Sequence, residues 1–189
     1  MPPKQKTDRE AIIRAAVDIV RKNGEQALNA RSIAAELGSS TQPIFSNFKT
    51  MDKLRGALIE HAGGLCASFM QRESQRTDIP AYKANGLALI RFAEEERELF
   101  KLLFMRDRRD EAISDDDSKL KPIIEIIMKQ SGLSEECARR LHLEMWIFVH
   151  GIASMIATNY IKWDPDVVSS MLTDIYRGLL MRYKEEKNA

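Results

Sequence analysis

Residues 29–53 read NARSIAAELGSSTQPIFSNFKTMDK and contain two short apolar patterns joined by a turn. Each pattern places two apolar side chains four residues apart, on one face of a helix: Ile33 and Leu37, then Ile44 and Phe48. Gly38 lies between them, and glycine adopts at no steric cost the positive φ that commonly ends a helix. Two helices joined by a short turn containing Gly predict a helix-turn-helix. An ordinary αα-hairpin has the same pattern, so the flanking residues must separate these two interpretations.

The segments on both sides favour the helix-turn-helix. An amphipathic helix is predicted before the motif, because apolar residues recur at helical spacing from Ile12 to Val20 and Gly24 ends the run. Thr7 and Glu10 have the spacing of a capping box at the start of this helix. A lysine and the start of another helix follow the motif. The N-terminal part is therefore predicted to form a three-helix unit.

The second helix of the motif presents a mostly polar surface, made of Thr41, Gln42, Phe45, Ser46 and Asn47. Such side chains can face the base edges and phosphates of a DNA groove. Ser39 or Ser40 is predicted to cap this helix. Pro43 fits its first turn, because the missing N–H of proline would have no partner there.

The remainder of the chain also has helical periodicity. We predict helices over residues 52–75, 80–96, 120–128, 134–161 and 165–183, and a buried apolar run over 99–104. Three ends have named signals: Gly132 closes the helix that begins at Leu120, Ser134 caps the next, and Asp164 caps the last, with Pro165 in its first position. Gly63–Gly64 interrupts the first of these, either as a tolerated pair or as a soft point in a linking helix. No β-strand pattern appears. We therefore predict an all-α fold of about nine helices, with a helix-turn-helix domain over residues 1–57 and a larger helical domain over residues 58–189.

Charge is distributed unevenly between these two parts. Residues 1–57 contain ten Lys and Arg against six Asp and Glu, whereas the remainder contains nineteen against twenty-two. A basic N-terminal part beside a mildly acidic body fits a protein with one end that binds nucleic acid.

Targeting and membrane signals are missing from the sequence. There is neither a secretory signal nor an apolar run of about 18 residues that would span a membrane. Cys66 and Cys137 are isolated in sequence, as is typical of reduced cysteines in a cytosolic protein. We predict a cytoplasmic protein without a membrane anchor.

Motifs for catalysis, cofactors and metals are also missing, so we predict no enzyme, no cofactor and no metal site. Asp115–Asp117 are adjacent carboxylates without the alternate spacing of a calcium loop, and we interpret them as a solvated loop. His142 and His150 are two helical turns apart, about 12 Å along the axis, which is too far to share one ion. These histidines are predicted to be packed or hydrogen-bonded.

The run from Arg9 to about His61 resembles the DNA-binding domain of the TetR/AcrR family of bacterial transcriptional regulators. The matching residues are Ala15–Ala16, Gly24, Ile33–Ala34, Gly38, Ser40, Phe45, Phe48, Lys53 and Leu54. In that family the second helix of the motif, here about Ser40–Phe48, enters the major groove of operator DNA. The resemblance implies that the following residues contact DNA: Arg31, Ser40, Thr41, Gln42, Pro43, Phe45, Asn47, Lys49 and Lys53.

Three positions depart from the usual pattern of the family. The family usually has Tyr, His and Lys where this chain has Phe45, Asn47 and Met51. Phe45 cannot donate the hydroxyl hydrogen bond that tyrosine makes to phosphate, whereas Asn47 keeps a donor. Lys49 or Lys53 can supply the charge that Met51 lacks.

Residues 146–155, WIFVHGIASM, resemble a Trp…His-Gly motif in the C-terminal ligand and dimer domain of one TetR subgroup. The small residues in this run allow close approach of a partner subunit, of another helix of the same chain, or of a ligand. We predict a homodimer through the last two helices, with these interface residues: Gly151, Ala153, Met155, Met171 and Ile175. The inducer cavity of the family implies a pocket with these residues: Phe104, Met105, Met128, Trp146 and His150.

Taken as a whole, the sequence predicts a homodimeric transcriptional regulator, most simply a repressor. Its partners are double-stranded palindromic operator DNA and a small-molecule effector that releases it. One alternative is a helical protein–protein adaptor that keeps the fold without sensing a ligand, which a C-terminal core without a cavity would favour. Another is a helical enzyme, which only a polar cavity with convergent ionisable groups would favour.

Overall fold

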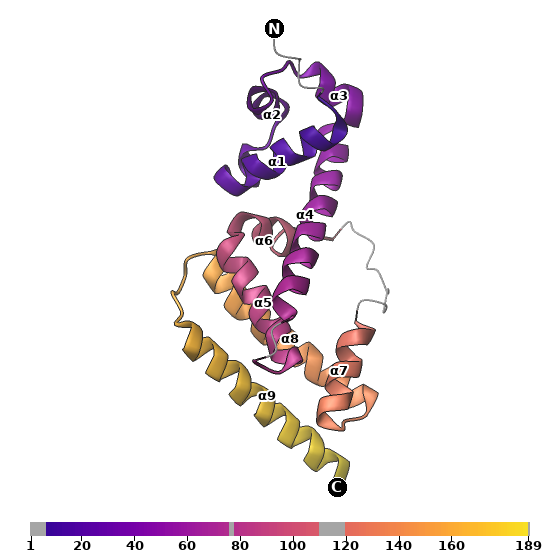
Figure 1. Ribbon diagram of the computed structural model, residues 1–189, viewed down its shortest axis with the longest axis vertical. Coiled ribbons are helices and arrows are strands. Elements are labelled where there is room, and N and C mark those ends of the chain that lie inside the picture. Colours follow the sequence, from indigo (N-terminus) through magenta and orange to yellow (C-terminus); the bar gives the residue numbers. More distant parts are fainter. Residues whose placement is uncertain (1–6, 76–77, 110–119, 189) are drawn as a thin grey trace. The chain divides into compact units, whose positions relative to one another are not determined.

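The computed structural model describes residues 7–75, 78–109 and 120–188 of the 189-residue chain. Within these ranges the chain forms nine α-helices and one short 3-10 helix, with no β-strand, which confirms the predicted all-α fold (Figure 1). The helices are α1 (Arg9–Asn23), η1 (Glu25–Ala27), α2 (Ala30–Glu36), α3 (Gln42–Phe48), α4 (Met51–Ser74), α5 (Ala81–Glu95), α6 (Arg97–Phe104), α7 (Lys121–Ser131), α8 (Glu135–Ala157) and α9 (Pro165–Asn188). The acidic run at Asp115–Asp117 lies outside the described residues.

The contacts between residues divide the chain into two compact units. The first comprises the residues up to Ser68 together with Glu96–Arg106, and the second comprises Phe69–Glu95 together with the residues from Asp107 onward. The first unit is therefore discontinuous in sequence, because α6 belongs to it and α5 does not. The functional boundary after residue 57 remains a prediction, because it concerns which residues bind DNA.

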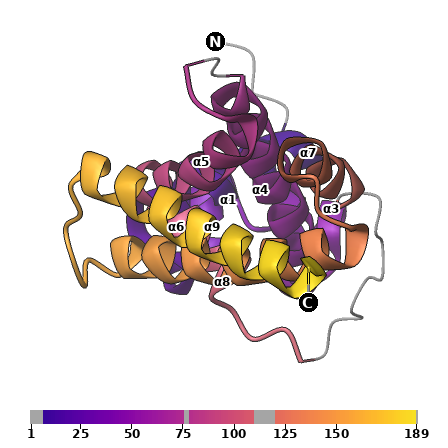
Figure 2. The same ribbon diagram turned by 90° about the horizontal axis from the view of Figure 1, so that it is seen from below.

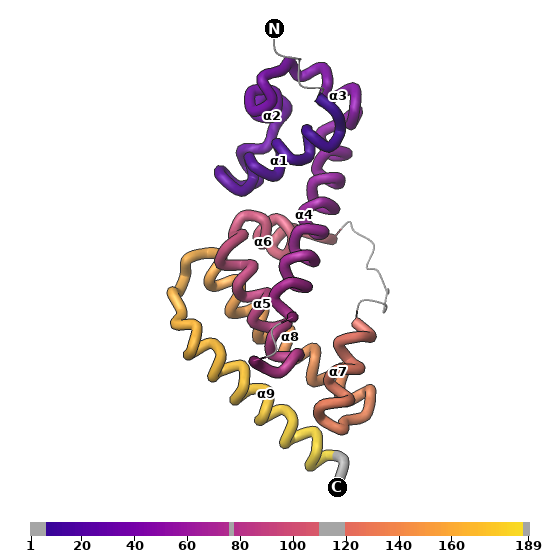
Figure 3. Tube along the Cα trace, viewed as in Figure 1, coloured from indigo at the N-terminus to yellow at the C-terminus, as the bar shows by residue number. Residues whose placement is uncertain are grey.

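Helix α1 is the centre of the first unit, where it contacts α2, α3 and α6 (Figure 3). Its side chains Ile12, Ala16 and Val20 are fully buried. In its last turn, the guanidinium of Arg21 donates hydrogen bonds of 2.8 and 2.7 Å to the two carboxylate oxygens of Glu96. The hydrogen bonding to Glu96 raises the pKa of Arg21 above its usual value. This ion pair fixes α1 to the residue that precedes α6.

Three predicted helix ends are confirmed by their cap geometry. Gly132 has a φ of +72° and ends α7. The Ser134 hydroxyl accepts the N–H of Cys137 at 3.3 Å at the start of α8. The Asp164 carboxylate accepts the N–H of Asp166 at 2.8 Å, with Pro165 in the first position of α9. Each cap satisfies a backbone group that the helix itself leaves without a partner.

Two other predicted ends are wrong. Asp8, and not Thr7, caps α1, because the Asp8 carboxylate accepts the N–H of Ala11 at 2.8 Å. Helix α8 ends at Ala157, before the predicted Ile161. Asn159 has a φ of +54°, and asparagine is one of the few residues that tolerate this conformation.

The Gly63–Gly64 pair lies inside α4, which continues through it without a break. A Cβ added at either glycine meets no atom within 4 Å. Packing therefore does not require glycine at these positions, and each lowers the stability of the helix by about 0.5–1 kcal/mol relative to alanine.

Helix α5 is the centre of the second unit, where it packs against α7, α8 and α9. Helices α8 and α9 lie side by side in Figure 2, joined by a short loop. Gly86 of α5 faces both of them: an added Cβ would lie 3.3 Å from Val149 of α8 and 3.9 Å from Leu172 of α9. Both of these side chains are buried. Glycine therefore lets the three helices approach one another closely.

We predict that replacing Gly86 by Val lowers the free energy of unfolding by roughly 1–3 kcal/mol, because the extra atoms overpack the α5–α8–α9 contact. The matched control is Gly64→Ala, which has open space for its Cβ and should raise the free energy of unfolding by about 0.5–1 kcal/mol. Urea denaturation followed by circular dichroism measures both. A Gly86→Val protein with the wild-type midpoint would show that this contact is not tight.

Candidate nucleic-acid interface

Helix α2 begins with a reciprocal cap that the sequence interpretation missed. The Asn29 side-chain oxygen accepts the N–H groups of Arg31 and Ser32, each at 3.0 Å. The Ser32 hydroxyl in turn accepts the N–H of Asn29 at 3.0 Å. The spacing of Asn29 and Ser32 is that of a capping box, so the sequence did contain the signal. This cap fixes where the first helix of the motif starts.

The turn of the motif has the geometry predicted from Gly38. Gly38 has a φ of +57°, and its N–H donates to the carbonyl of Ala35 at 3.1 Å. The N–H of Ser39 donates to the carbonyl of Ala34 at 2.9 Å. These two bonds form a Schellman motif, which ends α2 and redirects the chain toward α3.

Neither Ser39 nor Ser40 caps α3, so that prediction is wrong. Thr41 precedes the helix and makes no capping hydrogen bond through its side chain. The hydroxyl of Ser39 donates instead to the carbonyl of Ser40 at 3.0 Å. A cap would bond the N–H of the second or third helical residue, and the second is Pro43, which has none. A side-chain cap therefore has one fewer donor to satisfy here.

Helix α3 has one buried and one exposed face. Ile44 and Phe48 are buried, at 1% and 3% exposure. The opposite side exposes four of the residues predicted to face DNA, namely Gln42, Phe45, Ser46 and Asn47, while Thr41 and Pro43 are half-buried. The helix is thus oriented with the predicted set directed away from the core of its unit.

Cations of the first unit differ in whether a carboxylate neutralises them. Five of them pair with carboxylates: Arg14 with Glu10 at 3.4 Å, Arg21 with Glu96 at 2.7 Å, Lys22 with Glu36 at 3.3 Å, Arg55 with Glu25 at 3.8 Å and Lys101 with Glu98 at 2.7 Å. Among the described residues, no carboxylate pairs with any of the three exposed cations of the predicted interface, which are Arg31, Lys49 and Lys53. These three flank α3 at the start of α2, the end of α3 and the start of α4. Positive charge without a carboxylate partner is therefore present around the motif, where a polyanion could bind.

Two of these cations occupy positions that the helices disfavour. Arg31 lies in the first turn of α2 and Lys53 in the first turn of α4. The positive end of a helix dipole disfavours a cation there, typically by about 0.3–1 kcal/mol. These two cations therefore do not stabilise their helices. Such placement is expected of residues whose role is to bind a partner.

Lys49 forms a strained junction between α3 and α4. Its φ is +61°, and the N–H of Thr50 donates to the carbonyl of Phe48 at 2.7 Å, which closes a γ-turn around Lys49. The Thr50 hydroxyl then accepts the N–H of Lys53 at 3.3 Å and caps α4. In the described residues, only Asn159 shares a positive φ without being glycine. Lysine tolerates this conformation poorly, at a cost of about 1–3 kcal/mol, and such strain clusters at functional sites.

In the second unit, the predicted hydrogen-bonded histidine is confirmed at His142. Its Nδ1 lies 3.0 Å from the hydroxyl of Tyr82. Burial lowers the pKa of His142 and raises that of Tyr82. The ring of Tyr176 lies 5.8 Å from that of Tyr82. Among the described residues, no cluster of three or more His, Cys, Asp or Glu side chains could hold a metal ion.

Comparison with known proteins places the second unit in a family. A profile described as Tetracyclin repressor-like, C-terminal domain, matches residues 82–175. The chain belongs to the TetR family. Members of this family are transcriptional regulators rather than enzymes. No sequence among curated proteins matches the chain significantly.

Solved structures share the fold of this TetR-family chain over nearly its whole length. A TetR-like transcriptional regulator from Rhodococcus sp. RHA1 is 18% identical, with a TM-score of 0.61 over 90% of this chain and 94% of that one. The multidrug binding protein EbrR in complex with imidazole is 18% identical, with a TM-score of 0.60 over 93% and 97%. A TetR protein from Acinetobacter baumannii AYE in complex with minocycline is 17% identical, with a TM-score of 0.58 over 97% and 99%. Within the described residues, no helix is long and apolar enough to cross a membrane.

The predicted pocket residues of the TetR-family chain are divided between its units. Phe104 and Met105 belong to the first unit, and both are exposed. Met128, Trp146 and His150 belong to the second unit. There the Trp146 and His150 rings lie 4.1 Å apart between centroids, and Trp146 is 48% exposed.

One of the predicted interface residues is wrong. Ala153 is fully buried inside the protomer, so its side chain is not available to a partner. Met155 and Ile175 are exposed, and Met171 is half-buried. Gly151 has open space around an added Cβ, which excludes tight packing within the protomer as the reason for glycine there.

For Lys49 of this TetR-family chain, we predict that replacement by Gly raises the free energy of unfolding by about 1 kcal/mol, because glycine removes the strain of a positive φ. Lys49→Ala is the matched control, since it removes the same charge and keeps the Cβ. Its stability should remain within about 0.5 kcal/mol of wild type. Urea denaturation of the three proteins decides, and equal stability of the Gly and Ala variants would contradict strain at Lys49.

Proposed function

We propose that this TetR-family chain is a homodimeric transcriptional repressor that binds palindromic operator DNA and is released by a small-molecule effector. The observation that carries the proposal is the group of exposed cations around α3, Arg31, Lys49 and Lys53, which no described carboxylate neutralises. Phosphate contacts fix the register of a protein on DNA, and side chains of an inserted helix read the bases. Helix α3 is the element that enters the major groove, with Gln42 in its first turn. The protein acts in the cytoplasm.

An exposed apolar stripe on α8 supports a homodimer. Leu143 and Ile147 are 56% and 58% exposed, and Met155 is also exposed farther along the helix. Gly151 lies between them, with open space for a Cβ. The opposite side of α8 carries its core residues, including Leu141 and Ile152. A helix with apolar residues on both sides is expected to pack on both sides.

Helix α9 has a matching stripe. Val167, Ile175 and Met181 are exposed, and Met171 is half-buried. Gly178 lies among them, again with open space for a Cβ. Two adjacent helices with apolar stripes and a glycine in each can form a four-helix bundle with their copies. In a two-fold dimer such a contact is isologous, so the same surface serves both subunits.

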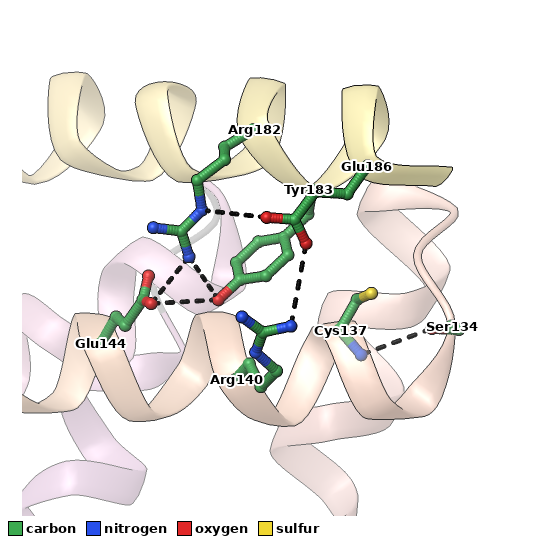
Figure 4. A network of polar contacts seen from close by, with 7 residues as sticks. All are labelled: Ser134, Cys137, Arg140, Glu144, Arg182, Tyr183 and Glu186. Atoms are coloured by element: carbon green, nitrogen blue, oxygen red, sulfur yellow. Dashed lines mark hydrogen bonds and ion pairs between the residues drawn. The ribbon is translucent and has the colours of Figure 1, made fainter. Parts of the chain in front are cut away.

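A polar network holds α9 against α8 at one end of this face (Figure 4). The Arg182 guanidinium and the Tyr183 hydroxyl donate to the same carboxylate oxygen of Glu144, at 2.7 and 3.0 Å. Burial opposes ionisation of Glu144, but the hydrogen bonds from Arg182 and Tyr183 outweigh it and lower the pKa of this carboxyl. Arg140 and Glu186 form a second pair at 3.7 Å. The network therefore fixes the position of α9 along α8, and with it the relative position of their two apolar stripes.

The effector is proposed to bind in the second unit, where Met128, Trp146 and His150 are the candidate contacts. EbrR was solved with imidazole and the Acinetobacter protein with minocycline, so two proteins of this fold hold ring-containing small molecules. Release follows from a population shift, in which the effector favours dimers whose two α3 helices do not match successive major grooves, about 34 Å apart. A protein–protein adaptor that does not bind DNA is not favoured, because that function does not explain why Arg31 and Lys53 occupy helix positions that disfavour cations.

We predict that Lys53→Ala weakens binding to all duplex sequences about equally, whereas Gln42→Ala relaxes sequence preference by roughly 1–3 kcal/mol if its amide contact is bidentate. For Lys53→Ala the slope of log K against log salt should fall by about 0.9 for each phosphate that the variant no longer neutralises. Fluorescence anisotropy on a panel of operator variants measures both effects. The control is Arg14→Ala, which removes a cation already paired with Glu10. Identical behaviour of the Lys53 and Gln42 variants would refute their assigned roles.

We predict that Gly151→Leu weakens the dimer or changes the spacing of its two helix-turn-helix domains. Gly151→Ala should leave both the dimer and this spacing unchanged. A Cβ at this position meets no atom of the protomer within 4 Å. Circular dichroism verifies that the variant is folded, so that a loss of dimer reports on the partner and not on the fold. Analytical ultracentrifugation at micromolar concentration, with DNA binding measured alongside, tests this. A monomeric wild type would exclude the interface. A Gly151→Leu protein that stays dimeric and binds DNA fully would exclude Gly151 from it.

A further inference from the structure

Side chains on the exposed face of α3 differ in whether their polar groups are already engaged. The Ser46 hydroxyl donates to the carbonyl of Gln42 at 3.0 Å. The Asn47 amide donates to the carbonyl of Pro43 at 2.8 Å. The Ser46 donor and one of the two Asn47 donors are thus bonded to the backbone of their own helix. Among the described residues no group bonds the Gln42 side-chain amide, so its donor and acceptor remain available.

Phe45 is the apolar exception on this face. Its ring is 44% exposed, although the other two large apolar residues of α3, Ile44 and Phe48, are buried. A phenyl ring has no hydroxyl, so it cannot hydrogen-bond a phosphate. Burying such a ring in a complex is favourable, and in the major groove the apolar group of a base edge is the methyl group of thymine. The partner that suits Phe45 is therefore thymine.

Gln42 and Phe45 are three residues apart and hence neighbours on the helix surface, about 5–6 Å apart at their Cβ atoms. Successive base pairs are about 3.4 Å apart, so the two side chains reach the same or adjacent pairs. A glutamine amide matches adenine, because it accepts from N6 and donates to N7. The Gln42 amide and the Phe45 ring thus select the same kind of base pair.

We infer that α3 reads A·T pairs in the major groove, with the Gln42 amide on adenine and the Phe45 ring on a thymine methyl group in each half-site. This rests on the proposed DNA-binding function and specifies its operator. The Phe45 contact replaces a phosphate contact by a base contact, so the position that aligns with tyrosine in the family becomes a determinant of sequence specificity here.

The inference is tested with the intact dimer and a duplex selected by it from a randomised pool. Single thymines of that duplex are replaced by deoxyuridine, which removes only the 5-methyl group. For the wild type, one thymine per half-site should be sensitive, with an affinity loss of about fourfold per half-site, as for one buried methyl group. Phe45→Ala should bind the thymine and deoxyuridine duplexes equally. Phe45→Tyr keeps the ring and should keep the discrimination.

The adenine contact is tested by 7-deazaadenine, which lacks the N7 acceptor. At one adenine per half-site, this replacement should lower the affinity of the wild type at least about fivefold. It should leave the affinity of Gln42→Ala unchanged. Arg14→Ala is the control: it removes a cation of α1 that is already paired with Glu10, so both discriminations should persist. Circular dichroism verifies that each variant is folded.

The outcomes separate this inference from the proposed function. A wild type that selects no duplex at all refutes DNA binding itself, and the inference with it. Sequence-specific binding that is indifferent to deoxyuridine at every thymine, or a selected half-site without A·T pairs, overturns the inference and leaves the function intact. The same holds if Phe45→Ala preserves the discrimination between thymine and deoxyuridine.

Discussion

Burial of Ile44 and Phe48 is the interaction on which the proposed DNA-binding surface depends. Helix α3 has only seven residues, contains a proline and lacks a side-chain cap. A helix of two turns is unstable alone, because its nucleation is unfavourable and few residues propagate it. Fully burying two such apolar side chains contributes about 1.5–3 kcal/mol each. Arg9 of α1 adds a cation–π contact, 4.3 Å from the centre of the Phe48 ring. Tertiary packing therefore creates the helix and also decides which of its faces is exposed.

The features that lower stability in the first unit are concentrated around this same surface. Arg31 and Lys53 lie at the positive ends of helices, and Lys49 has a backbone conformation that suits glycine. Elsewhere in the unit the local choices agree with the fold: Asn29 caps α2, Gly38 ends it, and Lys22 and Arg55 have carboxylate partners. Natural sequences are consistent across levels except where function requires otherwise. The departures therefore coincide with the proposed binding surface, and they do so independently of any resemblance.

Much of this organisation was predictable from local signals. Gly38, Gly132, Ser134 and Asp164 marked helix ends correctly because turn and cap chemistry depends on neighbouring residues alone. The start of α1 was misassigned because Thr7 and Asp8 are both good caps, and only the geometry selects one. The end of α8 was placed too late because the apolar run up to Ile161 outweighed the signal of Asn159. The exposed face of α3 followed from the spacing of Ile44 and Phe48.

Other features depend on contacts that no local pattern contains. Arg21 and Glu96 are 75 residues apart, so their ion pair could not be anticipated. Helix α8 has apolar residues on two sides, and periodicity does not say which side faces its own chain. Ala153 was assigned to the partner for this reason, although it is buried in the protomer. The γ-turn at Lys49 could not be predicted either, because lysine is not a residue type that indicates a positive φ.

The discontinuity of the first unit has a consequence for how the protein is made. Its closing element, Glu96–Arg106, is synthesised after Phe69–Glu95, which belong to the other unit. At about 5–20 residues per second, the ribosome adds that intervening segment within a few seconds. During that interval α1 has no α6 to pack against, and Arg21 has no Glu96. The N-terminal helices therefore complete their fold only when the nascent chain has passed Arg106. The first unit becomes able to bind DNA only after part of the second unit has been synthesised.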